Sequence, residues 1–260
     1  MDFDASQNIL PLENLQEGGP ANSGRLTSFY LTGQDMTGSL KWKYVADLDM
    51  LRSHSQLFAT KLVNGQEYCA LDITYYNRSD EFTTVLKIMR YIDVVQLLRP
   101  HSYIYEVPAG AIQPEELARF NFPATEATPP FDNTESYPHL FNLWLCGNQI
   151  RSSSITRYLV LAIFLKVRAT RHSLSSEDFI EYWVNTNDNE HEVLRRLMVT
   201  VVLMSPDFEE NREWRSQMLS ALPDEVKEAM IHQTTEHRSR PVNAYSDFVS
   251  NWDILESIEE

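Results

Sequence analysis

The segment of residues 47–62, DLDMLRSHSQLFATKL, constrains the fold of this chain more than any other feature. Its apolar residues follow the period of one helix face, which predicts a helix packed against a core. The residues of this stripe are Leu48, Leu51, Phe58 and Leu62. The position that would continue the stripe holds Ser55, and His54 precedes it. The serine is therefore either a nucleophile beside a base or a small residue that close packing requires.

Helix geometry favours the packing interpretation. Adjacent residues on a helix point about 100° apart, so His54 and Ser55 are badly placed to form a nucleophile–base pair. We predict that Ser55 packs closely beneath its neighbours. Its hydroxyl is then expected to bond to the carbonyl four residues back.

The remaining pattern predicts strands first and helices later. Strands are expected at Leu26–Thr32 and Leu40–Val45, forming a hairpin, at Tyr68–Tyr75, and in a short piece near residues 102–107. Helices are expected over several segments with apolar residues three and four apart. These segments are 79–92, 140–150, 155–169, 175–183, 192–204, 208–219 and 223–232.

Charge and composition exclude several classes of protein. The formal charge of −15 argues against a nucleic-acid surface, which needs clustered Lys and Arg. Phosphate-binding loops need glycines at fixed offsets, and the chain has eight glycines in none of those patterns. The apolar run Tyr158–Val167 is about half the length that spans a bilayer and reads as a core helix. We expect no cofactor, no nucleic-acid partner and no membrane partner.

The cysteines and the first residues bear on the compartment. The sequence starts with the acidic MDFDASQNIL, which does not resemble a signal peptide. Cys69 and Cys146 are therefore expected to be free thiols in a reducing compartment. The expected localisation is cytoplasmic or nuclear, not secreted.

The first half resembles the BTB/POZ family in the order of its segments. The central family motif, H-K-x-x-L-x-x-x-S-x-x-F, matches at Leu51, Ser55 and Phe58. A family strand of the I-x-L type looks like residues 71–73, and the helix after it looks like residues 82–91. Residues 143–150, LWLCGNQI, resemble the family helix written LYVLADKL.

The second half is similar to the segment that follows this domain in many fungal BTB proteins. There a Y-x-x-T loop precedes LRRLLVD. The matching residues are Tyr182, Asn185, Thr186, Leu194, Arg195, Arg196 and Leu197. The resemblance implies an α/β fold, with a short mixed β-sheet, flanking helices and an all-α extension.

The resemblance also implies a domain plan. Residues 1–23 are expected to be a flexible tail and residues 24–169 a BTB-like domain. That domain would carry a proline-rich insertion at about 108–136. Residues 170–235 would form the helical extension, and residues 236–260 a polar tail.

Two departures from the family bear on self-association. The charged residues that open the central motif are replaced by Asp47 and Leu48, and the aspartate near the first strand falls near Thr27. In the family these charges lie near the dimer interface. Their loss puts the standard homodimer in doubt.

Motifs for metal binding and catalysis are weak. His232 and His237 are five apart, which fits solvated surface histidines better than a metal pair. Three carboxylates open the predicted helix at 175–183, and they suit its N-terminal dipole better than catalysis. They are Glu177, Asp178 and Glu181. We therefore expect that the protein is not an enzyme and binds no metal.

The sequence thus predicts a protein–protein interaction module for self-association or scaffolding. The alternative is a substrate adaptor of a cullin-type ubiquitin ligase, because Ile104–Glu106 fits the short cullin-contacting pattern of some BTB proteins. Among the tryptophans, Trp214 and Trp252 have polar surroundings and suit a partner surface. The candidate partner-binding residues are Asp47, Leu48, Leu51, Ile104, Glu106 and Trp252.

Overall fold

The computed structural model describes residues 26–35, 38–62, 79–98, 135–169, 174–186, 191–228 and 230–231. The chain divides into two compact units, which we name unit 1 (Met1–Leu161) and unit 2 (Ala162–Glu260). The division falls within helix α6, Ser153–Ala169, whereas the sequence analysis expected a boundary at the end of this helix.

Unit 1 begins with the predicted β-hairpin, which is confirmed. Strand β1, Leu26–Asp35, pairs antiparallel with strand β2, Gly38–Asp47. The register sets Leu26 opposite Asp47 at the open end and Asp35 opposite Gly38 at the turn. Both strands are longer than predicted.

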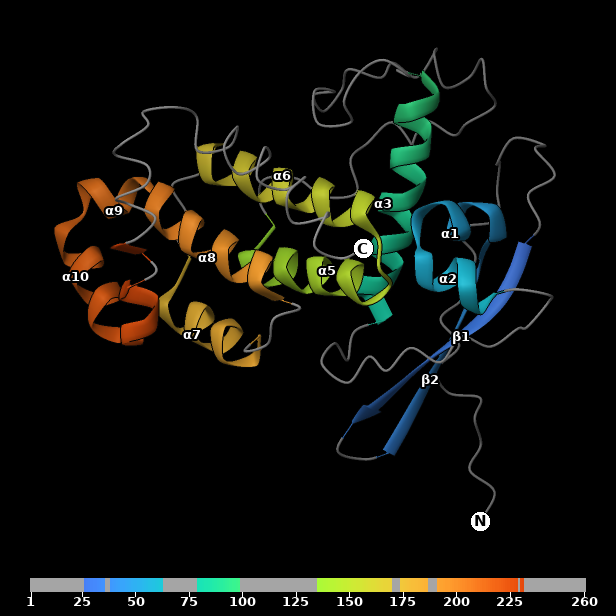
Figure 1. Cartoon of the computed structure of the whole chain (residues 1–260), viewed down its shortest axis with the longest axis horizontal. Helices are drawn as coiled ribbons and strands as arrows, with labels where there is room; N and C mark the ends of the chain where they lie inside the picture. The colour runs from blue at the N-terminus through green and yellow to red at the C-terminus, as the bar shows by residue number, and fades with distance from the viewer. Residues whose placement is uncertain are drawn as a thin grey trace. The chain divides into compact units, whose positions relative to one another are not determined.

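Helices make up the rest of the described part of unit 1. Helix α3 packs against α1 and α5, and α1 also contacts β2 (Figure 1). The predicted helices at 79–92, 140–150 and 155–169 are confirmed as α3, α5 and α6. The bounds are α1 Leu48–His54, α2 Gln56–Lys61, α3 Ser79–Leu98 and α5 Tyr137–Gln149.

Aromatic rings join the hairpin to the helices of unit 1. The ring of Phe82 on α3 meets Tyr44 of β2 edge-to-face at 4.9 Å between centroids and Phe58 of α2 at 6.2 Å. Both edge-to-face geometries are favourable for ring quadrupoles. Several large side chains of this core are fully buried: Leu51, Phe58, Ile88, Met89, Ile92, Phe141 and Trp144.

The predicted fold class, an α/β BTB/POZ-like fold with a short mixed sheet, is wrong. The described residues are mostly helical, and their strands form one antiparallel hairpin. A mixed sheet needs parallel pairing as well, and no third strand joins the hairpin within the described ranges. The strands predicted at 68–75 and 102–107 lie outside those ranges, as do the proline-rich segment 108–134 and both predicted tails.

Unit 2 is helical throughout its described part. Its helices are α7 Ser176–Asn185, α8 Glu192–Met204, α9 Pro206–Glu210 and α10 Arg212–Ala221, and residues 224–228 and 230–231 are helical too. Ser175 and Asp178 are three residues apart, which is the spacing of a capping box and predicts a cap for α7. This cap is confirmed, because the Ser175 hydroxyl accepts a hydrogen bond from Asp178 N at 3.0 Å.

One predicted helix of unit 2 is two helices. The segment 208–219 breaks at Asn211, whose backbone is extended and whose side chain caps α10 by accepting a hydrogen bond from Trp214 N at 3.0 Å. Asparagine favours such caps because its carbonyl oxygen satisfies a free N–H of the first turn. The capping asparagine lies inside a segment of continuous apolar periodicity, so the pattern predicts one helix where the structure has two.

Candidate functional site

The interrupted stripe of residues 47–62 is two helices, not the one predicted. Ser55 separates α1 from α2 with extended backbone angles, φ −141° and ψ 119°. Its hydroxyl accepts a hydrogen bond from Phe58 N at 3.1 Å, so it is the N-cap of α2. The same hydroxyl donates to the carbonyl of Ile150 and not to the carbonyl four residues back. The predicted small, buried serine is confirmed at 2% exposure, but the predicted hydrogen bond is wrong.

The start of α2 docks onto the turn between α5 and α6. Backbone N–H groups of Gln56 and Leu57 donate to the carbonyls of Arg151 and Ile150, at 3.3 and 3.4 Å. Arg151 has a positive φ of 53°, which turns the chain tightly at this point. The first N–H groups of a helix have no partners within it, so this turn satisfies two of those of α2.

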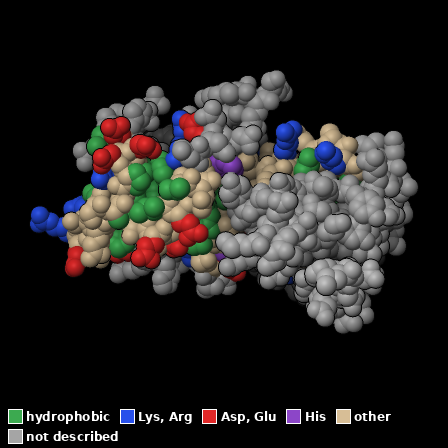
Figure 2. Space-filling model, turned by 90° about the horizontal axis from the view of Figure 1, so that it is seen from below, with side chains coloured by type: hydrophobic (Ala, Val, Ile, Leu, Met, Phe, Trp, Pro, Cys, Tyr) green, Lys and Arg blue, Asp and Glu red, His purple; other side chains and the backbone are tan. Residues whose placement is uncertain are grey.

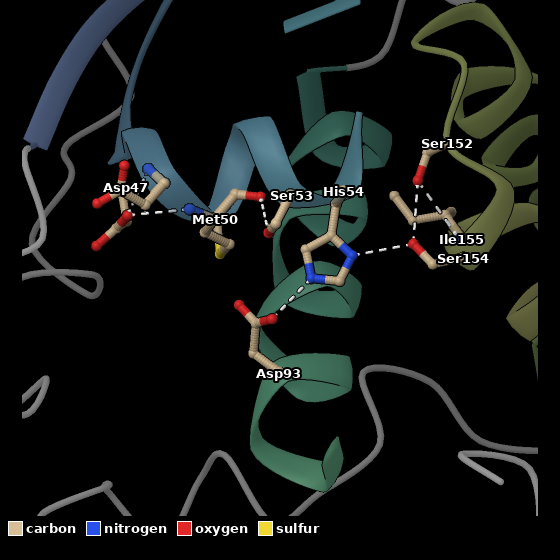
Figure 3. Close-up of polar contacts among 9 residues, drawn as sticks. Asp47, Met50, Ser53, His54, Asp93, Ser152, Ser154 and Ile155 are labelled. Atoms are coloured by element: carbon tan, nitrogen blue, oxygen red, sulfur yellow. Dashed lines mark hydrogen bonds and ion pairs between the residues drawn. The ribbon is translucent and has the colours of Figure 1, made fainter. Parts of the chain in front are cut away.

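His54 lies in a row of polar side chains from three helices (Figure 3). Its Nε2 lies 2.9 Å from Asp93 Oδ1 on α3, and its Nδ1 lies 2.9 Å from Ser154 Oγ on α6. Ser152, just before α6, extends the row, because its Oγ lies 3.3 Å from Ser154 Oγ. All four residues belong to unit 1.

The row has one consistent set of hydrogen-bond directions when the imidazole is neutral. An aspartate carboxylate accepts but does not donate, so His54 Nε2–H donates to Asp93. Nδ1 then accepts from the hydroxyl of Ser154, whose oxygen can accept from Ser152. Ser152 Oγ in turn accepts from Ile155 N at 3.4 Å and helps to cap α6.

This row contains the residue types of a serine nucleophile, a base and an acid. Its burial suits a structural role better, because the His54 side chain is 5% exposed and joins α1 to α3 and α6. A buried imidazole without partners would cost free energy, and here both ring nitrogens have partners. The row therefore links three helices, α1, α3 and α6, through hydrogen bonds.

Sequence reasoning missed Asp93 and Ser154 as partners of His54. They lie 39 and 100 positions further along the chain. The available signals were local and weak: Asp93 is a carboxylate within the apolar run of α3, and Ser154 belongs to the polar interruption IRSSS. Neither pattern names a partner.

The predicted partner-binding residues within the described ranges have internal roles. Asp47 caps α1 by accepting from Asp49 N and Met50 N, at 2.8 and 3.0 Å. Leu48 is 6% exposed and Leu51 is fully buried, so both belong to the core of unit 1. A partner-binding role for these three residues stays a prediction. Ile104, Glu106 and Trp252 lie outside the described residues, and so do His232 and His237.

The described residues also bear on two other functions, metal binding and membrane insertion. No group of three His, Cys, Asp or Glu side chains within these ranges lies close enough to hold a metal ion. None of the described helices is long and apolar enough to cross a membrane. Cys146 is a buried free thiol, and burial raises its pKa, with a smaller contribution from the nearby Glu81 carboxylate.

Unit 2 exposes apolar side chains that its core does not use. Val184 on α7 is 63% exposed and Ile231 is 67% exposed. Figure 2 shows hydrophobic side chains gathered on one face, with Asp and Glu side chains around them. A gathered apolar surface with a polar rim is typical of a site that binds another macromolecule.

Comparison with known proteins gives this chain no relative: no family model, no curated protein and no solved structure matches it. The resemblance to the BTB/POZ family therefore stays a prediction from the sequence.

Proposed function

We propose that this chain is a protein–protein interaction module that holds a partner on the exposed apolar face of unit 2. The observation that carries this proposal is the exposure of Val184 and Ile231, two large apolar side chains of unit 2. An isolated apolar residue on a surface is ordinary, whereas several gathered on one face favour burial against a partner. The adaptor alternative rested on Ile104 and Glu106, so no described residue supports it.

A capture experiment with matched variants tests this function. The wild-type chain, Val184→Asp and a control, Glu210→Lys, are immobilised and exposed to an extract of the cells that make the protein. Glu210 is an exposed residue at the end of α9. We expect proteins retained by the wild type and the control to be lost with Val184→Asp. Equal retention by all three chains would contradict the proposal.

A second candidate function is ester or amide hydrolysis by the row at His54. It is favoured by the 2.9 Å contacts of the imidazole with Ser154 and Asp93. A fluorophosphonate probe tests it, because such a probe forms a covalent bond with an activated serine. Labelling of the wild type that disappears in Ser154→Ala would establish this candidate, and absence of labelling is the result expected from a structural row.

A further inference from the structure

Helix α7 has an inner and an outer apolar face. Phe179 and Trp183 are buried and stack on each other, with ring centroids 5.5 Å apart and an interplanar angle of 18°. Ile180 and Val184, one position further along, form a second pair four residues apart. Because successive residues turn by about 100°, Val184 points outward beside the buried pair and is exposed, whereas Ile180 is half-buried.

The inner face is firmly attached to α8. The guanidinium of Arg195 lies 4.0 Å from the centre of the Trp183 ring, and its Nη2 donates to the Trp183 carbonyl at 3.2 Å. The Thr186 hydroxyl donates to the Tyr182 carbonyl at the end of the helix. The two Arg195 contacts join Trp183 to α8 and fix the rotation of α7, which leaves Val184 pointing outward.

A row of carboxylates lies beside the outer apolar pair. Glu177 and Glu181 are four residues apart and exposed, and on a helical projection they fall next to Val184 on the side away from the core. Within the part of the chain that the structure describes, neither forms an ion pair. Helix α7 itself carries three carboxylates and no Lys or Arg.

The outer side of α7 therefore combines the exposed Val184 with a negative border of Glu177 and Glu181.

We infer that the outer face of α7 binds a basic amphipathic helix of another protein. This inference rests on the proposed function and names its partner class. An apolar stripe on such a helix would cover Ile180 and Val184, and its Lys or Arg side chains would meet Glu177 and Glu181. Amphipathic helices are commonly recognised through apolar anchors three and four residues apart. The net charge of −15 would also speed the encounter with a basic partner.

A second copy of this chain is a poorer occupant of the same face. In a two-fold dimer the same patch meets itself, so the Glu177–Glu181 row would approach a row of like charge. Like charges across an interface are repulsive and disfavour that pairing. This repulsion does not affect self-association through other faces of the chain.

A peptide titration tests this inference on the full chain. The probe is a fluorescein-labelled peptide of about 18 residues, with Leu along one helix face and Lys elsewhere, and the control peptide has Glu in place of Lys. Anisotropy gives the Kd for the wild type, Val184→Asp, Glu181→Lys and the matched control Glu210→Lys. The two charge reversals, Glu181→Lys and Glu210→Lys, change the net charge by the same amount. Circular dichroism checks that each variant is folded.

The expected result is binding of the lysine peptide alone, weakened about tenfold by Val184→Asp and by Glu181→Lys but hardly by Glu210→Lys. Equal weakening by both reversals would mean diffuse attraction and would overturn the inference. If the lysine peptide does not bind but Val184→Asp still abolishes capture from the extract, the inference of a basic partner is refuted and the proposed function is not. Light scattering that shows a dimer abolished by Val184→Asp would assign the face to a second copy and also overturn it.

Discussion

Replacing Ser55 by alanine is predicted to destabilise unit 1 strongly for so small a change. The hydroxyl caps α2 at Phe58 N and donates to the Ile150 carbonyl, and both bonds are lost. Loss of the N-cap leaves the buried Phe58 N–H without this partner and costs about 1–2 kcal/mol, and loss of the bond to the Ile150 carbonyl costs about 1 kcal/mol. The Ile150 carbonyl keeps the N–H of Leu57, so it is not left without a donor. We therefore expect a loss of about 2–3 kcal/mol in the free energy of unfolding.

The matched control is Ser53→Ala, two positions earlier. Ser53 is exposed, and its hydroxyl donates to the Met50 carbonyl within α1 at 2.9 Å. Its replacement should change the free energy of unfolding by less than about 0.5 kcal/mol. Urea unfolding followed by tryptophan fluorescence and by circular dichroism measures both variants. If Ser55→Ala is no more destabilising than Ser53→Ala, the cap and the tether to the α5–α6 turn are refuted.

Three further predictions concern the packing and titration of unit 1. Gly147→Ala should lower the free energy of unfolding by about 1–3 kcal/mol, although alanine has the better helix propensity. The reason is that the added Cβ would lie 2.9 Å from Ile155 Cγ2. An increased urea midpoint would contradict this prediction. Burial raises the pKa of Tyr137 and of Tyr158 above the usual 10.0. The free energy of unfolding should therefore be unaffected by these phenols below pH 10 and should fall above it, by about 1.4 kcal/mol per pH unit for each phenol. Replacing either tyrosine by phenylalanine should reduce this loss. A urea midpoint that stays constant between pH 8 and 11 would be contrary evidence. The Cys146 thiol should react with a disulfide reagent only as fast as the chain unfolds, measured in a Cys69→Ser variant, and rapid reaction of the native chain would show that the thiol is accessible.

Periodicity predicted the helices well because each depends on residues close in sequence. The Glu192–Met204 helix was placed at its observed bounds, and the Ser175 cap was identified from its own motif. Breaks at Ser55 and Asn211 were missed, because a capping side chain inside an apolar run looks like a single interruption of a longer helix. The fold class failed for another reason, since strand pairing is a long-range property that local alternation does not specify.

In the candidate sites, too, local features were predicted from the sequence and contacts between distant residues were not. The His54 row joins residues from three separate helices, so no spacing in the sequence announced it. The carboxylates of α7 were recognised and assigned to the helix start, where Glu177 and Asp178 do lie in the first turn. What the sequence could not supply was the rotation of α7, which the contacts of Trp183 with Arg195 determine. That rotation leaves Val184 exposed beside the acidic row.

Hydrogen–deuterium exchange of the full chain, with and without the leucine–lysine peptide, tests the central claim most directly. The claim is that partners bind on the outer face of α7. We predict that the peptide slows exchange in α7, and that Val184→Asp abolishes this protection. Protection confined to other segments, or unchanged by Val184→Asp, would contradict the account.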